Sequence, residues 1–202
     1  MNVGVLASGA GTNLQALIDR VHGVDGIVIR GVASDRPDAP ALARARAAGI
    51  DAAAFPAAGH PDRAARDGAI VDWLRRRDVA LVVLAGYMQL VGDRFLQAFP
   101  GRVINVHPAL LPAFPGLNAI QQALEHGVKV FGVSVFLVDG GVDTGPLILQ
   151  QAIELPDAVD ADEVHDRLAP IEHDLIVDAV RLIARGAISI DPQNPRRVIV
   201  RR

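Results

Sequence analysis

Short apolar runs alternate with amphipathic stretches through the first half of the chain. The runs at residues 2–7, 27–33 and 81–85 are apolar at almost every position, which is typical of strands buried on both faces of a parallel sheet. Apolar residues recur at helical spacing between them. The helices are expected at about residues 14–21, 39–48 and 60–77, with a short extended piece at 52–55.

The second half continues the alternation of strands and helices. In order, it predicts a strand, a helix, two further strands and a long final helix. These elements cover residues 102–106, 117–126, 129–138, 147–155 and about 160–183. Strands alternating with helices, without a repeat or a low-complexity segment, predict an α/β fold with a doubly wound, mostly parallel sheet. Such sheets bind ligands beyond the carboxyl ends of their strands, so we expect the site there.

Composition and charge limit the possible classes. The chain has 202 residues, 50% of them hydrophobic, and a formal net charge of -3, so we expect one well-cored domain over residues 1–202. No extended basic surface for nucleic acid is expected, because the one basic cluster, Arg196-Arg197 with Arg201-Arg202, lies at the end and is interpreted as a solvated terminus. The absence of cysteine excludes disulfides, thiolate metal ligands and cysteine nucleophiles. No stretch is as long as a membrane span and the N-terminus lacks a basic flank, so a soluble, cytoplasmic protein is expected.

A glycine-rich turn at residues 8–13 joins the first strand to the first helix. Such a turn gathers unpaired backbone N–H groups at the positive end of a helix dipole, which suits a phosphate group. The third glycine of a dinucleotide fingerprint is missing and no P-loop lysine follows, so a plain tight turn stays an alternative. Asp35 lies about where dinucleotide folds place a ribose-binding carboxylate, and an acidic helix cap explains it equally well.

Asn105 and His107 lie two residues apart at the end of an apolar run. Alternate residues of a strand point to the same face, so the amide and the imidazole are expected to face one pocket. Three prolines follow within residues 108–115 and predict an irregular, stiff loop. A turn at 139–146 adds the carboxylate of Asp143.

This set of groups favours direct acyl transfer without a covalent intermediate. Asn105 would donate to a developing oxyanion, His107 would donate to the same oxygen or move a proton, and Asp143 would hold His107 protonated or accept a proton through water. No metal is expected, because only one histidine lies in the loop and the others have no ligand spacing. Each residue taken singly is also compatible with an ordinary turn or loop role.

Five blocks of the sequence resemble a known family. They lie at residues 8–16, 84–88, 105–116, 143–146 and 172–173. With them the chain resembles the folate-dependent phosphoribosylglycinamide formyltransferases from residue 1 to about residue 185. The resemblance implies transfer of a formyl group from 10-formyltetrahydrofolate, as co-substrate, to the amine of glycinamide ribonucleotide in purine biosynthesis. It also implies small-molecule partners only, no membrane or nucleic acid, and a monomer or homodimer.

The resemblance also assigns residues to each substrate. Asn105, His107 and Asp143 would be catalytic. Gly11, Thr12 and Asn13 would hold the substrate phosphate, and Glu172 would bind the glycinamide or ribose part. The folate site would be lined by Arg63, Met88, Gln89, Leu90, Val91, Asn105, Asp139, Gly140, Gly141, Val142 and Asp143. The chain would then divide into a nucleotide-binding half at about 1–100, a catalytic and folate-binding half at about 101–185, and an extension at 186–202.

The sequence departs from the family pattern at three places. Phe136 stands where the family usually has His, which removes a polar contact near the active site. Gln89 stands where the family usually has Arg, with little consequence expected because its contacts would be made largely by backbone. Ala169 and Pro170 replace polar residues just before Glu172.

Other functions remain open alternatives. Formyltetrahydrofolate hydrolase would need a further N-terminal domain and methionyl-tRNA formyltransferase a C-terminal one, and a first strand at residue 2 and an end at residue 202 leave room for neither. A catalytically reduced nucleotide or folate binder is the alternative from another class.

Overall fold

The computed structural model describes residues 1–201, which form two compact units. The first unit is Met1–Asn105 and the second begins at Val106. The boundary falls inside the strand β5 (Val103–His107), so this one strand contributes residues to both units.

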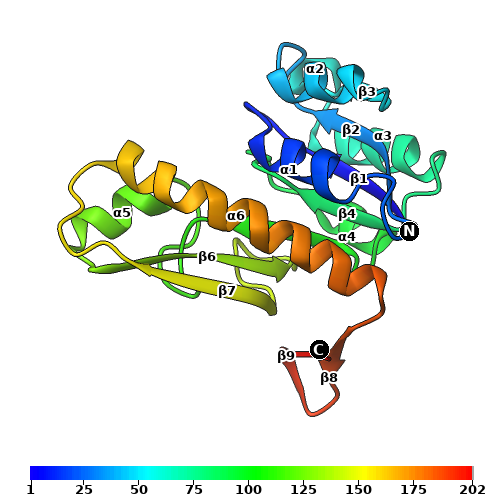
Figure 1. Ribbon diagram of the computed structural model, residues 1–202. Coiled ribbons are helices and arrows are strands. Elements are labelled where there is room, and N and C mark those ends of the chain that lie inside the picture. The colour runs from blue at the N-terminus through cyan, green and yellow to red at the C-terminus, as the bar shows by residue number, and fades with distance from the viewer. Residues whose placement is uncertain (202) are drawn as a thin grey trace. The chain divides into compact units, whose positions relative to one another are not determined.

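The first unit is built on a parallel sheet, as the apolar runs predicted. Its strands stand in the order β3-β2-β1-β4-β5, and every neighbouring pair is parallel. Figure 1 shows β3, β2, β1 and β4 following one another across this sheet. The bounds are β1 (Asn2–Leu6), β2 (Val28–Ser34), β3 (Ala52–Ala54) and β4 (Leu81–Leu84). The strand order reverses on the two sides of β1, and a crevice at this point of an α/β sheet is the usual ligand site.

Four α-helices and one short 3-10 helix connect these strands. They are α1 (Thr12–Arg20), α2 (Pro40–Ala47), η1 (Ala57–Gly59), α3 (Arg63–Arg75) and α4 (Asp93–Ala98). The helix α1 contacts α2, and α3 contacts α4. The helix α4 was not predicted, because six residues are too few to show a helical period.

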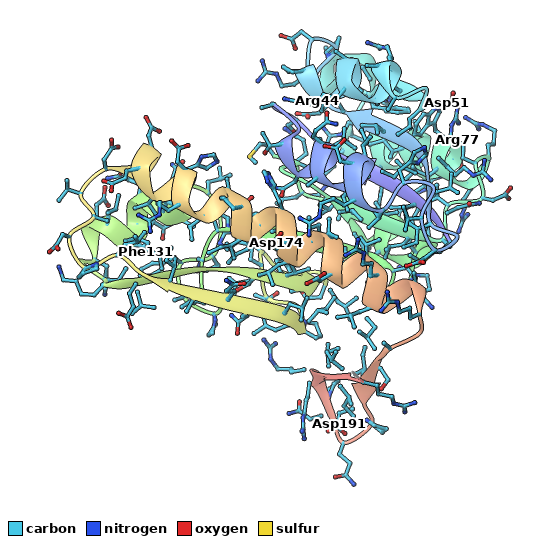
Figure 2. The ribbon with its side chains drawn as sticks, viewed as in Figure 1. Arg44, Asp51, Arg77, Phe131, Asp174 and Asp191 are labelled. Atoms are coloured by element: carbon cyan, nitrogen blue, oxygen red, sulfur yellow. The ribbon has the colours of Figure 1, made fainter. Side chains whose placement is uncertain are left out.

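Side chains fix the two ends of α3. The Asp62 carboxylate accepts a hydrogen bond from the Ala65 amide at 2.7 Å and caps the start of the helix. Beyond the end, Arg77 pairs with Asp51 at 2.9 Å and stacks over the Trp73 ring at 3.9 Å (Figure 2). The helix is thereby tied to the start of β3.

The second unit contains an antiparallel strand pair covered by a long helix. The strands β6 (Val130–Leu137) and β7 (Leu147–Glu154) pair along most of their length, and α6 (Ala161–Ala184) contacts both. Figure 1 shows α6 running along this pair. The short helix α5 (Ala119–Glu125) contacts α6. The mostly parallel sheet predicted for the whole chain is therefore parallel in the first unit and mainly antiparallel in the second.

The C-terminal residues form a β-hairpin, which was not predicted. The strands are β8 (Ile188–Asp191) and β9 (Asn194–Val200), and β9 meets β7 in parallel at the pair Leu147 and Arg197. Arg196 and Arg197 are exposed, as the interpretation of a solvated terminus requires, but they are part of a strand. Arg202, the last residue of the basic cluster, lies outside the described residues.

Membrane-spanning helices are missing from residues 1–201, where no helix combines the length and the apolar character that crossing a bilayer requires.

Candidate active site

The strand β5 presents Asn105 and His107 to the same side, as alternation along a strand predicted. The predicted strand ended at residue 106, but the observed one includes His107 as its last residue. His107 is buried, with 6% of its surface exposed, whereas Asn105 is half-buried. The imidazole is therefore held by a regular element rather than by a loop.

His107 and Asp143 meet, although 36 positions separate them in the sequence. His107 Nδ1 lies 3.4 Å from Asp143 Oδ2, and the two side chains are 7% and 14% exposed. The backbone amide of Gly116 donates to the same Asp143 oxygen at 2.8 Å. The other ring nitrogen, Nε2, lies 2.8 Å from the carbonyl oxygen of Phe114. Both ring nitrogens thus face oxygen acceptors, and only the doubly protonated ring donates to both.

The turn that carries Asp143 is organised by its own polar groups. Asp139 Oδ1 accepts from the Gly141 amide at 3.0 Å and from the Thr144 hydroxyl at 2.6 Å. A Cβ at Gly145 would lie 1.7 Å from the Leu137 carbonyl oxygen, so only glycine fits there. Asp143 itself has a φ of 53°, in the left-handed region. The backbone conformation of this turn therefore orients the Asp143 side chain. The spacing of residues in the sequence did not predict this.

A buried serine and a glutamine hold the loop after His107, and the sequence analysis missed both. Ser134 Oγ accepts from the Leu111 amide at 3.0 Å and donates to the Ala109 carbonyl at 2.6 Å. Gln150, opposite Ser134 on β7, donates to the Leu111 carbonyl and to Ser134 Oγ, each at 2.9 Å. Ser134 is 0% exposed, and its only sequence signal was a polar residue inside the apolar run of β6. The prolines predicted a stiff loop, and these side chains supply its anchors.

Phe136 lies on β6, two residues beyond Ser134. It is 1% exposed and pairs in register with Leu147. A buried aromatic ring thus occupies the position where the resemblance indicated a histidine, and Phe136 offers no polar atom there.

The glycine-rich turn starts α1 in the way that a phosphate site requires. Gly11 is the N-cap residue with a φ of 73°, and a Cβ there would lie 2.8 Å from the Ala41 Cβ. No side chain caps α1 and its first turn carries no acidic residue. Arg44 reaches from α2 to this turn, donating to the Ala10 carbonyl at 2.8 Å and to Gln15 at 3.1 Å (Figure 2). The sequence analysis missed Arg44, which lay in an alanine-rich helix without a motif.

Asp35 lies at the end of β2 and has a role other than the predicted helix cap. Its carboxylate accepts from the Ser8 hydroxyl and, at 3.1 Å, from Gln89 Nε2. The helix-cap alternative is wrong, because α2 starts at Pro40 without a side-chain cap.

The predicted folate-lining residues of the first unit gather around the segment that follows β4. The side chains of Met88 and Leu90 are exposed, at 60% and 55%, whereas that of Gln89 points to Asp35. Arg63 is the first residue of α3, and a Cβ at Gly92 would lie 3.6 Å from its guanidinium. The segment and the start of α3 are therefore neighbours. Burial raises the pKa of Tyr87, at the start of this segment, to about 12, although the nearby Arg66 opposes the shift.

Glu172 lies half-buried near the middle of α6. In the part of the chain that the structure describes, no three His, Cys, Asp or Glu side chains are grouped so as to hold a metal ion.

The chain has a Rossmann-like α/β fold in which His107, the last residue of β5, faces the carboxylate of Asp143. Residues 1–180 match the formyl transferase family, and the chain belongs to this family. It is 42% identical over 170 residues to the phosphoribosylglycinamide formyltransferase of Bacillus subtilis, covering 84% of this chain and 87% of that protein. The Mycobacterium tuberculosis H37Rv enzyme of the same name is 40% identical over 186 residues, covering 92% and 86%.

A solved structure supports the same assignment. The crystal structure of glycinamide ribonucleotide transformylase 1 from Symbiobacterium toebii has a TM-score of 0.95 to this chain and 46% identity, and the match covers 100% of this chain and 94% of that one. The predicted α/β fold class and the predicted family are confirmed, and none of the comparisons favours the hydrolase or the reduced binder.

Proposed function

We propose that the chain transfers a formyl group from 10-formyltetrahydrofolate to the amine of glycinamide ribonucleotide. One observation carries the proposal. The Asp143 carboxylate, oriented by the Gly116 amide, faces His107 at 3.4 Å at the end of the strand that also presents Asn105. An imidazole, a carboxylate and an amide donor are what direct acyl transfer requires, and no nucleophilic side chain is needed.

The amine nitrogen of the ribonucleotide attacks the formyl carbon, and a C–N bond forms as the carbonyl oxygen gains negative charge. Asn105 and protonated His107 donate to that oxygen. The attacking nitrogen loses a proton through water to Asp143, and this proton is passed on to N10 of the folate as the old C–N bond breaks. The products are the formylated ribonucleotide and tetrahydrofolate.

His107 has to give up one contact in this reaction. Its two nitrogens are occupied by Asp143 and by the Phe114 carbonyl, so the substrate oxygen replaces one of these acceptors. The Phe114 carbonyl is the expected one to leave, because the proposed mechanism uses Asp143 beside the ring. Hydrogen bonds that are exchanged on substrate binding are common in active sites.

The substrate-binding residues are also part of the proposal. Gly11, Thr12 and Asn13 hold the phosphate, supported by the uncapped start of α1 and by the Arg44 charge beside it. Glu172 binds the glycinamide or ribose part. The folate site comprises Arg63, Met88, Gln89, Leu90, Val91 and residues 139–143. The functional halves at about 1–100 and 101–185, the cytoplasmic location and the monomer or homodimer belong to the same proposal.

Two variants test the catalytic assignment. His107→Ala and Asp143→Asn should each lower kcat by on the order of 10² or more, with a much smaller change in KM. In Asp143→Asn the amide oxygen still accepts from Gly116, so the turn is kept while the charge is lost. Steady-state assays with both substrates measure the effect, and His165→Ala, at an exposed position on α6, is the control.

Either variant with near-normal kcat would refute its assigned role. A well-folded parent protein that binds a folate analogue but shows no turnover would favour the catalytically reduced binder instead.

A further inference from the structure

Four polar side chains connect three loops of the first unit at the point where the strand order reverses. The Ser8 hydroxyl donates to Asp35 and accepts from the Met88 amide at 2.8 Å. Gln89 Nε2 donates to the other Asp35 oxygen at 3.1 Å, and Arg66 Nη1 donates to Gln89 Oε1 at 3.1 Å. The chain Ser8–Asp35–Gln89–Arg66 thus joins the glycine-rich turn, the end of β2, the segment after β4 and the helix α3.

These contacts fix the segment of residues 87–92 at both ends. At its start, the Met88 amide is held by Ser8, whose own amide donates to the Gly86 carbonyl at 3.0 Å. At its end, the Gly92 amide donates to Asp67 Oδ2 at 2.8 Å. Gln89 lies between these two anchors and points inward, opposite to its exposed neighbours.

Two members of the network are buried, and Asp35 and Gln89 are half-buried. Ser8 is 3% exposed and Arg66 is 4% exposed. Hydrogen bonds in such surroundings are strong, and a missing partner there costs more than one at the surface. The geometry of residues 87–92 therefore depends on the bonds that Ser8 and Arg66 make here, although Arg66 Nε has no partner among the described residues.

Position 89 requires a side chain that both donates and accepts a hydrogen bond, and an amide does this. Its side chain accepts from a guanidinium with one atom and donates to a carboxylate with the other. Arginine has five donors and no acceptor, so an arginine at this position would turn a second guanidinium toward Arg66. Glutamate would accept from Arg66 but would face the Asp35 carboxylate.

We propose that Gln89 is a positioning residue, paired with Arg66, that holds residues 88–91 in the shape that the folate co-substrate requires. Its action is through the backbone of this segment, since its side chain is engaged inside the unit. The expected contacts of this segment remain backbone contacts, and in this proposal the Gln89 side chain determines where that backbone lies. This inference rests on the proposed folate site at residues 88–91.

A residue exchange tests the pairing. Gln89→Arg should raise KM for 10-formyltetrahydrofolate on the order of tenfold, the effect of about one lost hydrogen bond on binding, with kcat within about twofold. In the double variant Gln89→Arg with Arg66→Gln, the arginine at position 89 donates to Asp35 and the glutamine at position 66 accepts from that arginine. Donors and acceptors are then matched again, so most of the affinity for the folate should return. A merely structural role would lower the melting temperature without separating KM from kcat.

Two further variants complete the design. Gln121→Arg makes the same substitution on α5, where Gln121 donates to Glu125 one turn away. It should leave the folate KM and kcat unchanged. Gln89→Glu is nearly isosteric and replaces Gln89→Arg as the test if the arginine variant does not fold. It should also raise the folate KM. An unchanged folate KM in both Gln89 variants, or a double variant no better than Gln89→Arg, would overturn the proposal.

Amide hydrogen exchange separates this inference from the proposed function. Without any substrate, Gln89→Arg should accelerate exchange in peptides that cover residues 86–92 at least several-fold, and the double variant should restore protection. Accelerated exchange in a protein whose parent shows no formyl transfer would refute the proposed function alone. Normal turnover by the parent with unchanged exchange and KM in Gln89→Arg would refute the positioning role alone.

Discussion

Asp67 carries a carboxylate that is 1% exposed on the first turns of α3. One oxygen accepts from Gly92, and the other has no hydrogen-bond partner among residues 1–201. Burial raises the pKa of this carboxyl above its ordinary 3.8, although the Gly92 amide and the nearby Arg66 and Arg63 act in the opposite direction. The ionised form is therefore less favourable in the folded protein than in the unfolded chain.

This pKa shift predicts a pH dependence of stability. Below the ordinary pKa the carboxyl is protonated in both states and costs nothing, and the cost appears as the pH rises through the raised folded pKa. The gain in unfolding free energy from Asp67→Asn should thus be larger at about pH 7 than at about pH 3.5, where the unfolded carboxyl is mostly protonated. Urea unfolding at the two values measures it, with the exposed Asp72→Asn on the same helix as control. A difference that does not depend on pH would contradict the expected cost.

Single residues were predictable where a local rule determines their direction. The shared face of Asn105 and His107 follows from alternation along a strand, and the structure agrees. Ser134, Arg44 and Arg66 were not predictable, because their roles depend on partners in other elements. No periodicity or motif reports such a partner.

At the scale of elements, the close approach of α1 and α2 depends on the turn between β1 and α1. Gly11 has a positive φ, and the Ala41 Cβ lies 2.8 Å from where a Cβ of residue 11 would be. Only glycine therefore allows α1 to begin this close to α2. Gly9, two residues earlier, has nothing within 4 Å of its own Cβ position. The two glycines look equivalent in sequence and differ in structure.

This difference can be measured. Gly11→Ala should lower the free energy of unfolding by about 2 kcal/mol or more, from the left-handed backbone and the overpacking together. It should also raise KM for the ribonucleotide, because the proposed phosphate site moves with the turn. Gly9→Ala should change stability by less than about 1 kcal/mol. Equal losses in the two variants would show that the contact with Ala41 is not the cause.

The C-terminal hairpin makes a direct contact with the turn of residues 139–146. Arg196 Nη2 donates to the Thr144 carbonyl at 3.0 Å, next to Asp143. Arg197 pairs at 3.6 Å with Asp191, which Figure 2 labels in the hairpin. The basic residues that looked like a solvated end therefore include one that supports the turn of residues 139–146.

A moderate loss of rate is expected when this support is removed. Arg196→Ala should lower kcat by about twofold to tenfold, the range that one exposed hydrogen bond allows. Steady-state kinetics measure it, and Arg201→Ala, at the exposed end of the described chain, is the control. No change in kcat would mean that the turn holds Asp143 without the hairpin.

At the scale of the whole molecule, the α/β class and most strands were predictable from apolar periodicity. The strands β1 and β4 have the apolar character that burial on both faces imposes, whereas β2 includes the exposed Arg30 and β5 carries Asn105 and His107. The strand order, the antiparallel pairing of β6 with β7 and the terminal hairpin were not predictable. Each depends on which strands pair with one another, and apolar periodicity does not report strand pairing. The meeting of His107 with Asp143 is of the same kind, because the chemistry of the two groups suggested it and no spacing in the sequence determines it.

The position of Asn105 and His107 on one strand also bears on how the chain tolerates changes in length. A strand advances about 3.3 Å per residue and alternates its faces, so two residues place the amide and the imidazole about 6.6 Å apart on one side. A single insertion or deletion between them would turn one of the two to the opposite face. Surface loops readily absorb such changes. We therefore expect insertions and deletions to be tolerated in the connections between elements. They should not be tolerated within Asn105-Val106-His107, where the distance between the two functional side chains is set by the strand.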